Sequence, residues 1–248
     1  MNGLAIDTTS EACSVAVLDR HGNLLQRYAH APRQHGELLL GWIEELLCEC
    51  DLRPAQLDAI WVSHGPGSFT SLRMGFSVAT ALAFALDLPV VTVSSLQALA
   101  ARALAVAEQS LGDRDHDEIK PKLVLATLDA RLGEVYAAWY RCEQSARQQV
   151  LHLLGAEQLL PPTHLQWPDA SSADPLVAVG NGLLVAAGCL RTRAHARDCH
   201  CYPDCWPQAQ DLFSLADVTS AKPAWQVQLP YLRKKVAEKS VMKPMPET

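Results

Sequence analysis

The chain has 248 residues, of which 49% are hydrophobic and 19% are charged. This length and composition fit one large domain or two lobes with a packed core, and they argue against wholesale disorder. The formal net charge is −6, and an acidic protein is a poor stand-alone binder of nucleic acid, because phosphate contacts need a surplus of Lys and Arg. We therefore expect any RNA that this protein serves to be held mainly by a partner.

The N-terminal residues give no sign of an export signal. No basic segment or apolar leader precedes the first strand-like run, Leu4–Asp7, which predicts that no signal peptide is present. The longest uncharged apolar stretch, 74–86, lies between Arg73 and Asp87 and is shorter than the roughly 17–25 residues of a membrane span. We expect a cytoplasmic protein without a membrane anchor, whose eight cysteines are mostly thiols.

The first third of the chain alternates strand and turn signals. Strands are expected at 4–8, 13–18 and 24–29, with His21-Gly22-Asn23 as a turn, and a helix is expected from about Gln34 to Cys50. The apolar face of that helix is wider than packing on one sheet requires.

A second helix follows a glycine-rich turn. The pattern predicts a strand at 57–64, then a helix at 69–86 in which the only polar side chains after Arg73 are those of Ser77 and Thr80. A helix that is apolar nearly all round is expected to be buried on most sides. The next expected elements are a strand at 89–94 and a helix at 96–109.

The second half of the chain repeats an α/β pattern. The charged segment 112–120 marks a lobe boundary, so that residues 1–110 form an N-terminal lobe and 111–248 a C-terminal lobe, whose last helix packs back toward the first lobe. The remaining predictions are strands at 123–129, 134–141 and 176–179, loops at 160–175 and 198–207, a helix at 211–220 and a frayed tail after Lys239.

Asp7-Thr8-Thr9-Ser10 ends the first strand and is a candidate site. An acidic residue followed by small hydroxyl residues at a hairpin corner can hold a phosphate or a magnesium-bound water. The alternative is a turn in which Asp7 and Ser10 cap backbone amides.

Gly65-Pro66-Gly67-Ser68 opens the apolar helix. Glycines let backbone amides line up at a helix N-terminus, which favours an anion, although Ser68 or Thr70 could equally be an N-cap. No Lys follows the second glycine, so this turn is not a P-loop.

A cysteine cluster near residue 200 is a candidate metal site. Cys199, Cys201 and Cys205, with His200 among them, could supply thiolates to zinc, and Cys189 with His195 could complete the site. Only Cys201 and Cys205 approach the usual ligand spacing, so a variable loop is the alternative.

Motifs spread over the whole chain resemble the bacterial TsaB (YeaZ) family. In chain order they are Ala5-Ile6-Asp7-Thr8, Glu11–Ala16, Pro32-Arg33 with His35, Gly65–Thr70 with Arg73 and Gly75, Leu88-Pro89, Val93-Ser94 with Leu96, Asp129-Ala130-Arg131, Gly133–Tyr136, and Tyr231-Leu232-Arg233 with Val236, Ala237 and Lys239.

The resemblance implies an α/β, actin-like, sugar-kinase-like ATPase (ASKHA, ribonuclease H-like) fold of two lobes. It also implies a role in making threonylcarbamoyladenosine, next to the anticodon of tRNAs that read codons starting with A. In this pathway the related protein TsaD is expected to transfer the threonylcarbamoyl group. TsaB-like proteins are expected to act as its scaffold, with the ATPase TsaE joining the complex and tRNA reached only through that complex.

Two sequence features separate this chain from the catalytic relatives to which the resemblance points. Their His-x-x-x-His metal pair falls here on Ser95 and Leu99, and their adenosine-binding run is altered to Gly180-Asn181-Gly182-Leu183-Leu184. Leucine cannot ligate a metal and serine is a poor substitute for imidazole. We therefore expect no catalysis, no cofactor and no metal site. An ATP-dependent kinase-like enzyme or a metallopeptidase of the same fold is the alternative.

The family also implies that the two apolar helices pack against the same pair in the partner, or in a second copy as a homodimer. The candidate contacts are His35, Leu38, Leu39, Trp42, Leu46, Leu72, Arg73, Phe76, Val78 and Thr80. A vestigial nucleotide or phosphate site could persist at Asp7, Thr8, Gly65, Gly67, Ser68 and Asp129.

Overall fold

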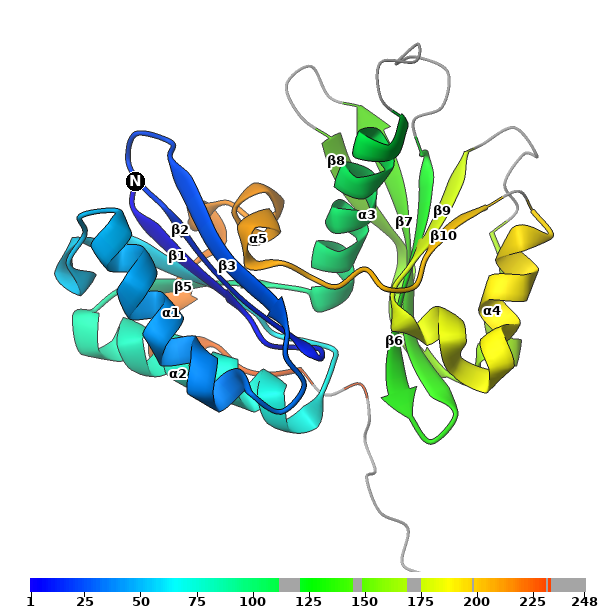
Figure 1. Ribbon diagram of the computed structural model, residues 1–248, viewed down its shortest axis with the longest axis horizontal. Helices are drawn as coiled ribbons and strands as arrows, with labels where there is room; N and C mark the ends of the chain where they lie inside the picture. Colours follow the sequence, from blue (N-terminus) through cyan, green and yellow to red (C-terminus); the bar gives the residue numbers. More distant parts are fainter. Residues whose placement is uncertain (112–120, 145–148, 169–174, 198, 231, 233–248) are drawn as a thin grey trace, which may run out of the picture.

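Two sheets with the same strand order form the frame of the molecule (Figure 1). The computed structural model describes residues 1–111, 121–144, 149–168, 175–197, 199–230 and 232. The first sheet has the order β3-β2-β1-β4-β5 with β11 at its edge, and the second has the order β8-β7-β6-β9-β10. In each sheet three antiparallel strands form a meander, and two further strands continue parallel to the first strand of that meander. The repeated order is that of two ribonuclease H-like lobes, so the predicted fold class is confirmed.

The strands have the following bounds: β1 (Gly3–Asp7), β2 (Ala12–Leu18), β3 (Leu24–His30), β4 (Ala59–Ser63), β5 (Pro89–Val93), β6 (Leu123–Arg131), β7 (Glu134–Gln144), β8 (Gln149–Leu160), β9 (Leu176–Val179), β10 (His200–Tyr202) and β11 (Lys222–Pro223). The helices are α1 (His35–Glu49), α2 (Phe69–Leu86), α3 (Ser95–Leu111), α4 (Val185–His195) and α5 (Ala209–Leu215). Short 3-10 helices lie at 54–56, 162–164, 181–184, 218–220 and 224–226.

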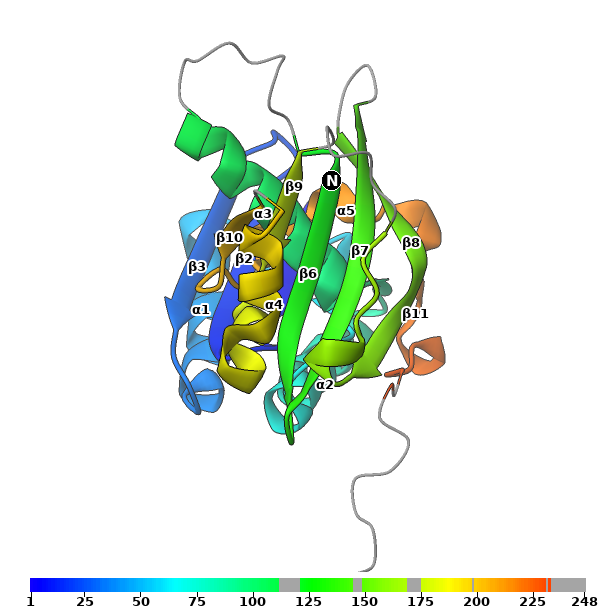
Figure 2. The same ribbon diagram turned by 90° about the vertical axis from the view of Figure 1, so that its right-hand side faces the viewer.

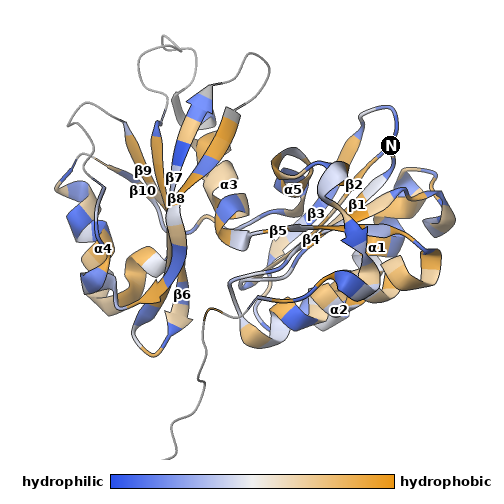
Figure 3. Ribbon diagram, turned by 180° about the vertical axis from the view of Figure 1, so that it is seen from behind, coloured by the Kyte–Doolittle hydropathy of each residue, from blue (hydrophilic) through white to orange (hydrophobic). Residues whose placement is uncertain are grey.

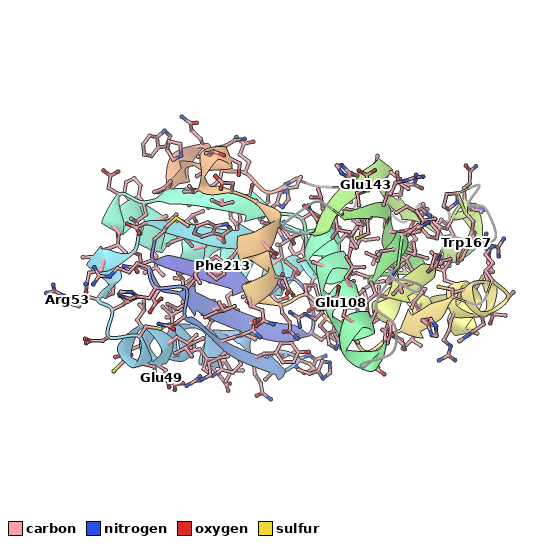
Figure 4. All side chains as sticks on the ribbon, turned by 90° about the horizontal axis from the view of Figure 1, so that it is seen from above. Glu49, Arg53, Glu108, Glu143, Trp167 and Phe213 are labelled. Atoms are coloured by element: carbon pink, nitrogen blue, oxygen red, sulfur yellow. The ribbon has the colours of Figure 1, made fainter. Side chains whose placement is uncertain are left out.

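Helices α1 and α2 cover the outer face of the first sheet, and α4 covers the outer face of the second (Figures 1 and 2). Strand alternation explains the division of the core, since successive side chains of a strand point to opposite faces. Leu4 and Ile6 of β1 pack toward α1 and α2, whereas Ala5 packs on the inner face with α5. Phe213 of α5 lies above that inner face (Figure 4), with its ring 5.1 Å from that of Trp61.

Helix α3 lies between the sheets and belongs to both cores. Its Ala98 packs with the inner face of the first sheet, whereas Leu99 and Ala103 pack with the second sheet. Arg102 of α3 forms a bidentate ion pair with Asp211 of α5, and both side chains are 12% exposed. The two lobes therefore share one helix, and that helix is tied to the first lobe by a nearly buried ion pair.

Most predicted elements of the first 140 residues are present, and several later predictions are corrected. β8 and α4 occupy segments for which no element was predicted, and β10 lies inside the predicted loop 198–207. The helix expected at 211–220 is α5, which ends at Leu215 because Ala216 has extended backbone (φ −145°, ψ 128°). The predicted boundary at 112–120 and the tail after Lys239 lie outside the described residues.

Candidate partner-binding face and interlobe cleft

The glycine turn before α2 packs tightly on the corner between β1 and β2. The Ser68 amide donates to the Thr9 carbonyl at 2.7 Å, and a Cβ at Gly67 would lie 2.0 Å from that same oxygen. The Thr8 hydroxyl donates to the Ser71 carbonyl at 2.6 Å. The amide of Ser68, which could have met a phosphate, is therefore used to join two parts of the chain.

Asp7 is buried beneath this corner and is 1% exposed. Its carboxylate accepts hydrogen bonds from the backbone amide and the hydroxyl of Thr9, each at 3.0 Å. Burial raises the pKa of Asp7 above its ordinary value, while the nearby Ser63 hydroxyl, the hydrogen bonds from Thr9 and the nearby His35 oppose the rise. The Asp7 carboxylate thus caps a backbone amide of its own turn, as in the alternative predicted from the sequence.

A cleft of about 340 Å³ lies between the lobes. Of the six residues of the predicted phosphate site, Gly67, Ser68 and Asp129 line this cleft, whereas Asp7, Thr8 and Gly65 do not. Asp129 accepts from the Arg131 amide at 2.7 Å and from its guanidinium at 3.0 Å. The predicted site is therefore divided between the buried corner and the open cleft.

The two positions that correspond to the metal histidines of the catalytic relatives have structural roles here. Ser95 is fully buried, and its hydroxyl donates to the carbonyl of Pro66 at 2.6 Å. Leu99 is fully buried in the core between α3 and the second sheet. These side chains secure the glycine turn and the interlobe helix.

The structure corrects part of the predicted partner-binding set. Leu39 and Leu46 are 1% and 0% exposed, and Leu72 is 8% exposed, because they pack into their own lobe. His35 is also buried, and its Nε2 lies 3.1 Å from the carbonyl oxygens of Ser10 and Ala12. The remaining candidates are half-buried: Leu38, Trp42, Arg73, Phe76, Val78 and Thr80.

Helix α2 leaves an apolar face uncovered, so the prediction from its residue pattern, that it is buried on most sides, is wrong. By length and composition this 18-residue helix is long and apolar enough to cross a membrane, which the shorter uncharged run 74–86 did not indicate, and 28% of it is buried. The buried part is one stripe that packs on its own lobe. The orange colouring along α2 marks its hydrophobic character (Figure 3). Its exposed residues are Phe69, Thr70, Ser77, Ala81, Phe84 and Ala85.

Sequence reasoning missed several of these outward residues. Phe69 and Phe84 of α2 are 60% and 72% exposed, and Leu40 of α1 is 59% exposed. Each is a large apolar side chain in an expected helix, so helical spacing counted from the buried stripe was the available signal. We name the exposed side chains of Leu40, Ser77, Ala81, Phe84 and Ala85 the α1/α2 face.

The predicted cysteine cluster is split by the second sheet. Cys199 and Cys201 pack on its outer side with α4, whereas Cys205 packs on the opposite side with α3. Among the described residues no three His, Cys, Asp or Glu side chains are grouped to hold a metal ion.

Comparison with known proteins identifies relatives of this chain. Residues 29–166 match the family model described as TsaD, tRNA N6-adenosine threonylcarbamoyltransferase. The chain is 40% identical over 133 residues to the tRNA threonylcarbamoyladenosine biosynthesis protein TsaB of Haemophilus influenzae, a match that covers 54% of this chain and 51% of that protein. It is 32% identical over 182 residues to TsaB of Escherichia coli, a match that covers 73% of this chain and 72% of that protein.

Among solved structures, YeaZ from Pseudomonas aeruginosa superposes with a TM-score of 0.75 at 33% identity, covering 93% of this chain and 99% of that one. The sequence match spans about half of the Haemophilus influenzae relative, whereas the structural match extends over both lobes. Since the family model covers more than half of the chain and the Escherichia coli match covers more than two thirds of both proteins, this chain belongs to the TsaB/YeaZ family of tRNA threonylcarbamoyladenosine biosynthesis proteins and contains a TsaD-related domain.

Proposed function

We propose that this chain is a non-catalytic subunit that binds and activates a TsaD relative, which then transfers the threonylcarbamoyl group to tRNA. In this proposal the α1/α2 face docks on the corresponding helices of the partner, TsaE joins the complex, and tRNA is reached only through it. The complex works in the cytoplasm, without a membrane anchor. Alone, the chain uses the same face to form a homodimer.

The uncovered apolar face of α2 is the observation that carries the proposal. Ser71, Leu72, Gly75, Ala79 and Ala83 form one buried stripe along the helix, as expected for a helix that packs on a sheet. The opposite side bears Ala81, Phe84 and Ala85 where a surface helix usually bears charges. An apolar patch of this kind indicates an interaction site, and small residues allow close approach of a second helix.

The absence of catalysis is supported by what the residues do in the fold. Ser95 and Leu99 are committed to packing and to the glycine turn, and the Asp7 carboxylate is buried against Thr9. A carboxylate that acts on a nucleotide must face the cleft in which the nucleotide lies. Asp129 does line the cleft, so an assay of this chain alone belongs in the test.

The test measures threonylcarbamoyl transfer to tRNA by a purified TsaD relative, with and without this chain. We expect transfer only in the mixture. Ala81→Glu places a charge in the centre of the α1/α2 face and should weaken partner binding by about 100-fold or more, because an unpaired charge buried at an interface costs about 3 kcal/mol. Isothermal titration calorimetry measures this loss.

The matched control is Thr192→Glu on the exposed side of α4, which should bind the partner as the unmodified chain does. Both substitutions lie on surfaces, so thermal unfolding should be nearly unchanged. Equal partner binding by the two variants would exclude the α1/α2 face. Transfer by this chain alone would support the enzyme alternative. Sedimentation of the chain alone, with and without Ala81→Glu, tests the homodimer.

A further inference from the structure

The outer side of the second lobe gathers basic side chains around α4. This helix packs on the 3-10 helix at 162–164 and on β10, and the described residues of this region, 161–168, 176–197 and 199–202, contain no Asp or Glu. Asp169, Asp174 and Asp198 lie outside the described residues. The exposed basic side chains are those of His164, Arg191, His195, Arg197 and His200.

Trp167 holds two arginines of this region in place. The Arg193 guanidinium lies 5.5 Å from the Trp167 ring and donates to the carbonyls of Pro162 and Leu165 at 3.2 and 2.9 Å. The Arg197 guanidinium lies 4.7 Å from the same ring and donates to the Arg193 carbonyl at 3.1 Å. Arg193 is therefore used by the fold, whereas Arg197 is oriented at the surface with further N–H donors to offer.

The charges of Arg191 and Arg197 are not neutralised by the part of the chain that the structure describes. Neither forms an ion pair with another described residue. The first lobe has the opposite character: Asp and Glu outnumber Arg in residues 1–111, which contain no Lys. A polyanion is therefore repelled by the first lobe and attracted to the outer side of the second.

We propose that Arg191, His195 and Arg197, which we name the α4 face, contact the sugar-phosphate backbone of an RNA. Guanidinium groups bind phosphate in a bidentate manner, and such contacts position an RNA without reading its sequence. The RNA is the tRNA of the proposed complex, so this inference rests on the proposed function. The α4 face lies at the opposite end of the molecule from the α1/α2 face (Figure 1), and a docked partner therefore leaves it accessible.

The experiment assembles the complex of this chain with a purified TsaD relative and measures its affinity for a fluorescently labelled tRNA transcript by anisotropy, at a series of salt concentrations. The double variant Arg191→Glu/Arg197→Glu should raise the Kd for tRNA by roughly tenfold or more at low salt. It should also make the plot of log K against log salt shallower by about 1.5–2, because each phosphate contact contributes about 0.7–0.9 to that slope.

The matched control is Arg20→Glu/Arg53→Glu, which makes the same change of charge at two exposed positions of the first lobe. Arg53 and Trp167 lie at opposite ends of the molecule (Figure 4). The control should keep the Kd and the salt slope of the unmodified complex. Arg191→Lys/Arg197→Lys retains both charges and should keep most of the slope. Thermal unfolding of each variant checks that the fold is retained.

Isothermal titration calorimetry of the TsaD relative separates this inference from the proposed function, because all three variants should bind the partner equally. A loss of partner affinity in Arg191→Glu/Arg197→Glu would assign the α4 face to a protein and overturn the proposal. An equal Kd and salt slope for this variant and its control would also overturn it.

If the chain does not bind the TsaD relative, the proposed function fails, and the α4 face is tested on the chain alone at low salt. The chain should then bind the tRNA transcript weakly, Arg191→Glu/Arg197→Glu should lose this binding, and Arg20→Glu/Arg53→Glu should keep it. No binding by the unmodified chain, or equal binding by the two variants, would overturn the proposal.

Discussion

The two lobes share a strand order but differ in the helix that covers the outer face of each sheet. The outer helix of the second lobe, α4, exposes the polar side chains of Arg191, Thr192 and His195 to solvent. One of the two outer helices of the first lobe, α2, exposes mainly alanine and phenylalanine. The same topology thus carries a polar outer surface on α4 of the second lobe and a largely apolar outer surface on α2 of the first lobe.

The lobes also differ in the helix that covers the inner face of each sheet. The inner face of the first sheet is covered by α5, whose first amide, that of Ala209, donates to the Ser14 hydroxyl at 2.9 Å. The second sheet has α3 in the corresponding place. Because α3 packs on both sheets and Arg102 joins it to α5, the lobes should unfold together. The differences between the lobes are therefore differences of surface more than of stability.

Arg102→Met gives the largest expected effect and tests the link between the lobes. It would leave the Asp211 carboxylate buried without its partner, and such losses cost about 3–5 kcal/mol. Urea unfolding should report this decrease. Arg131→Met is the control, because it removes exposed ion pairs to Glu11 and Asp129 and should change the free energy of unfolding by about 0–1 kcal/mol. Equal effects of the two substitutions on the free energy of unfolding would contradict the conclusion that α3 joins the two lobes through Arg102.

Alanine at two corresponding glycines compares the lobes directly. A Cβ at Gly67 would lie 2.0 Å from the Thr9 carbonyl oxygen, and one at Gly180 would lie 2.0 Å from that of Thr127. Each should lower the free energy of unfolding by about 1–3 kcal/mol. Gly180→Ala should cost roughly 1 kcal/mol more, because its φ is +95°.

Gly41→Ala is the control for these two substitutions. Gly41 lies in α1 with open space around its Cβ position, so alanine should stabilise the chain by about 0.5–1 kcal/mol. Thermal unfolding of the three variants checks the order. If Gly180→Ala left the free energy of unfolding unchanged while Gly67→Ala lowered it, the backbone near Thr127 would be able to move away from the new Cβ, and the backbone near Thr9 would not.

Asp7→Asn gives a smaller effect, in the pH dependence of stability. Because the pKa of Asp7 is raised above 3.8 in the folded chain, the folded state binds more protons than the unfolded state just above that pH. The free energy of unfolding should therefore fall as the pH rises through this range, until the folded-state pKa is passed. Asparagine removes this decline and still accepts from the Thr9 amide, so we expect equal or greater stability at neutral pH.

The control for Asp7 is Asp19→Asn. The pKa of Asp19 is lowered, chiefly by a hydrogen bond from Asn23, so its contribution has the opposite sign and is lost as the pH falls. Urea titrations at a series of pH values separate the two. If the free energy of unfolding changed with pH in the same way for the unmodified chain and for Asp7→Asn, the buried carboxylate would not contribute to the pH dependence of stability.

Sequence patterns predicted the first lobe well because its signals are local. The range 69–86 for α2 follows from its glycine turn and from Asp87, and the structure gives the same bounds. The α4 region was missed because Ala186, Ala187 and Gly188 have positive φ, which alanine does not signal. β8 was missed because its pairing with β7 includes a register shift, which blurs strict alternation.

The partner-binding residues were predicted less well, because helical spacing identifies an apolar stripe but does not show what packs against it. Leu39 and Leu46 lie on the same helix as Leu38 and Trp42, and only the packed structure assigns the first two to the core. Likewise, Cys199, Cys201 and Cys205 are close in sequence, yet the sheet separates the third from the others. Residues near one another along the chain are thus divided by tertiary packing.

The position of α5 and β11 has a consequence for synthesis on the ribosome. The first lobe consists of residues 3–93 together with 209–226, and β11 pairs with β5 only after the entire second lobe has been translated. Ala209 and Leu212 cover the inner face around Trp61. The first lobe therefore begins to emerge from the ribosome before the second lobe but is completed after it. A nascent chain halted after residue 200 would expose the apolar inner face of the first sheet to chaperones.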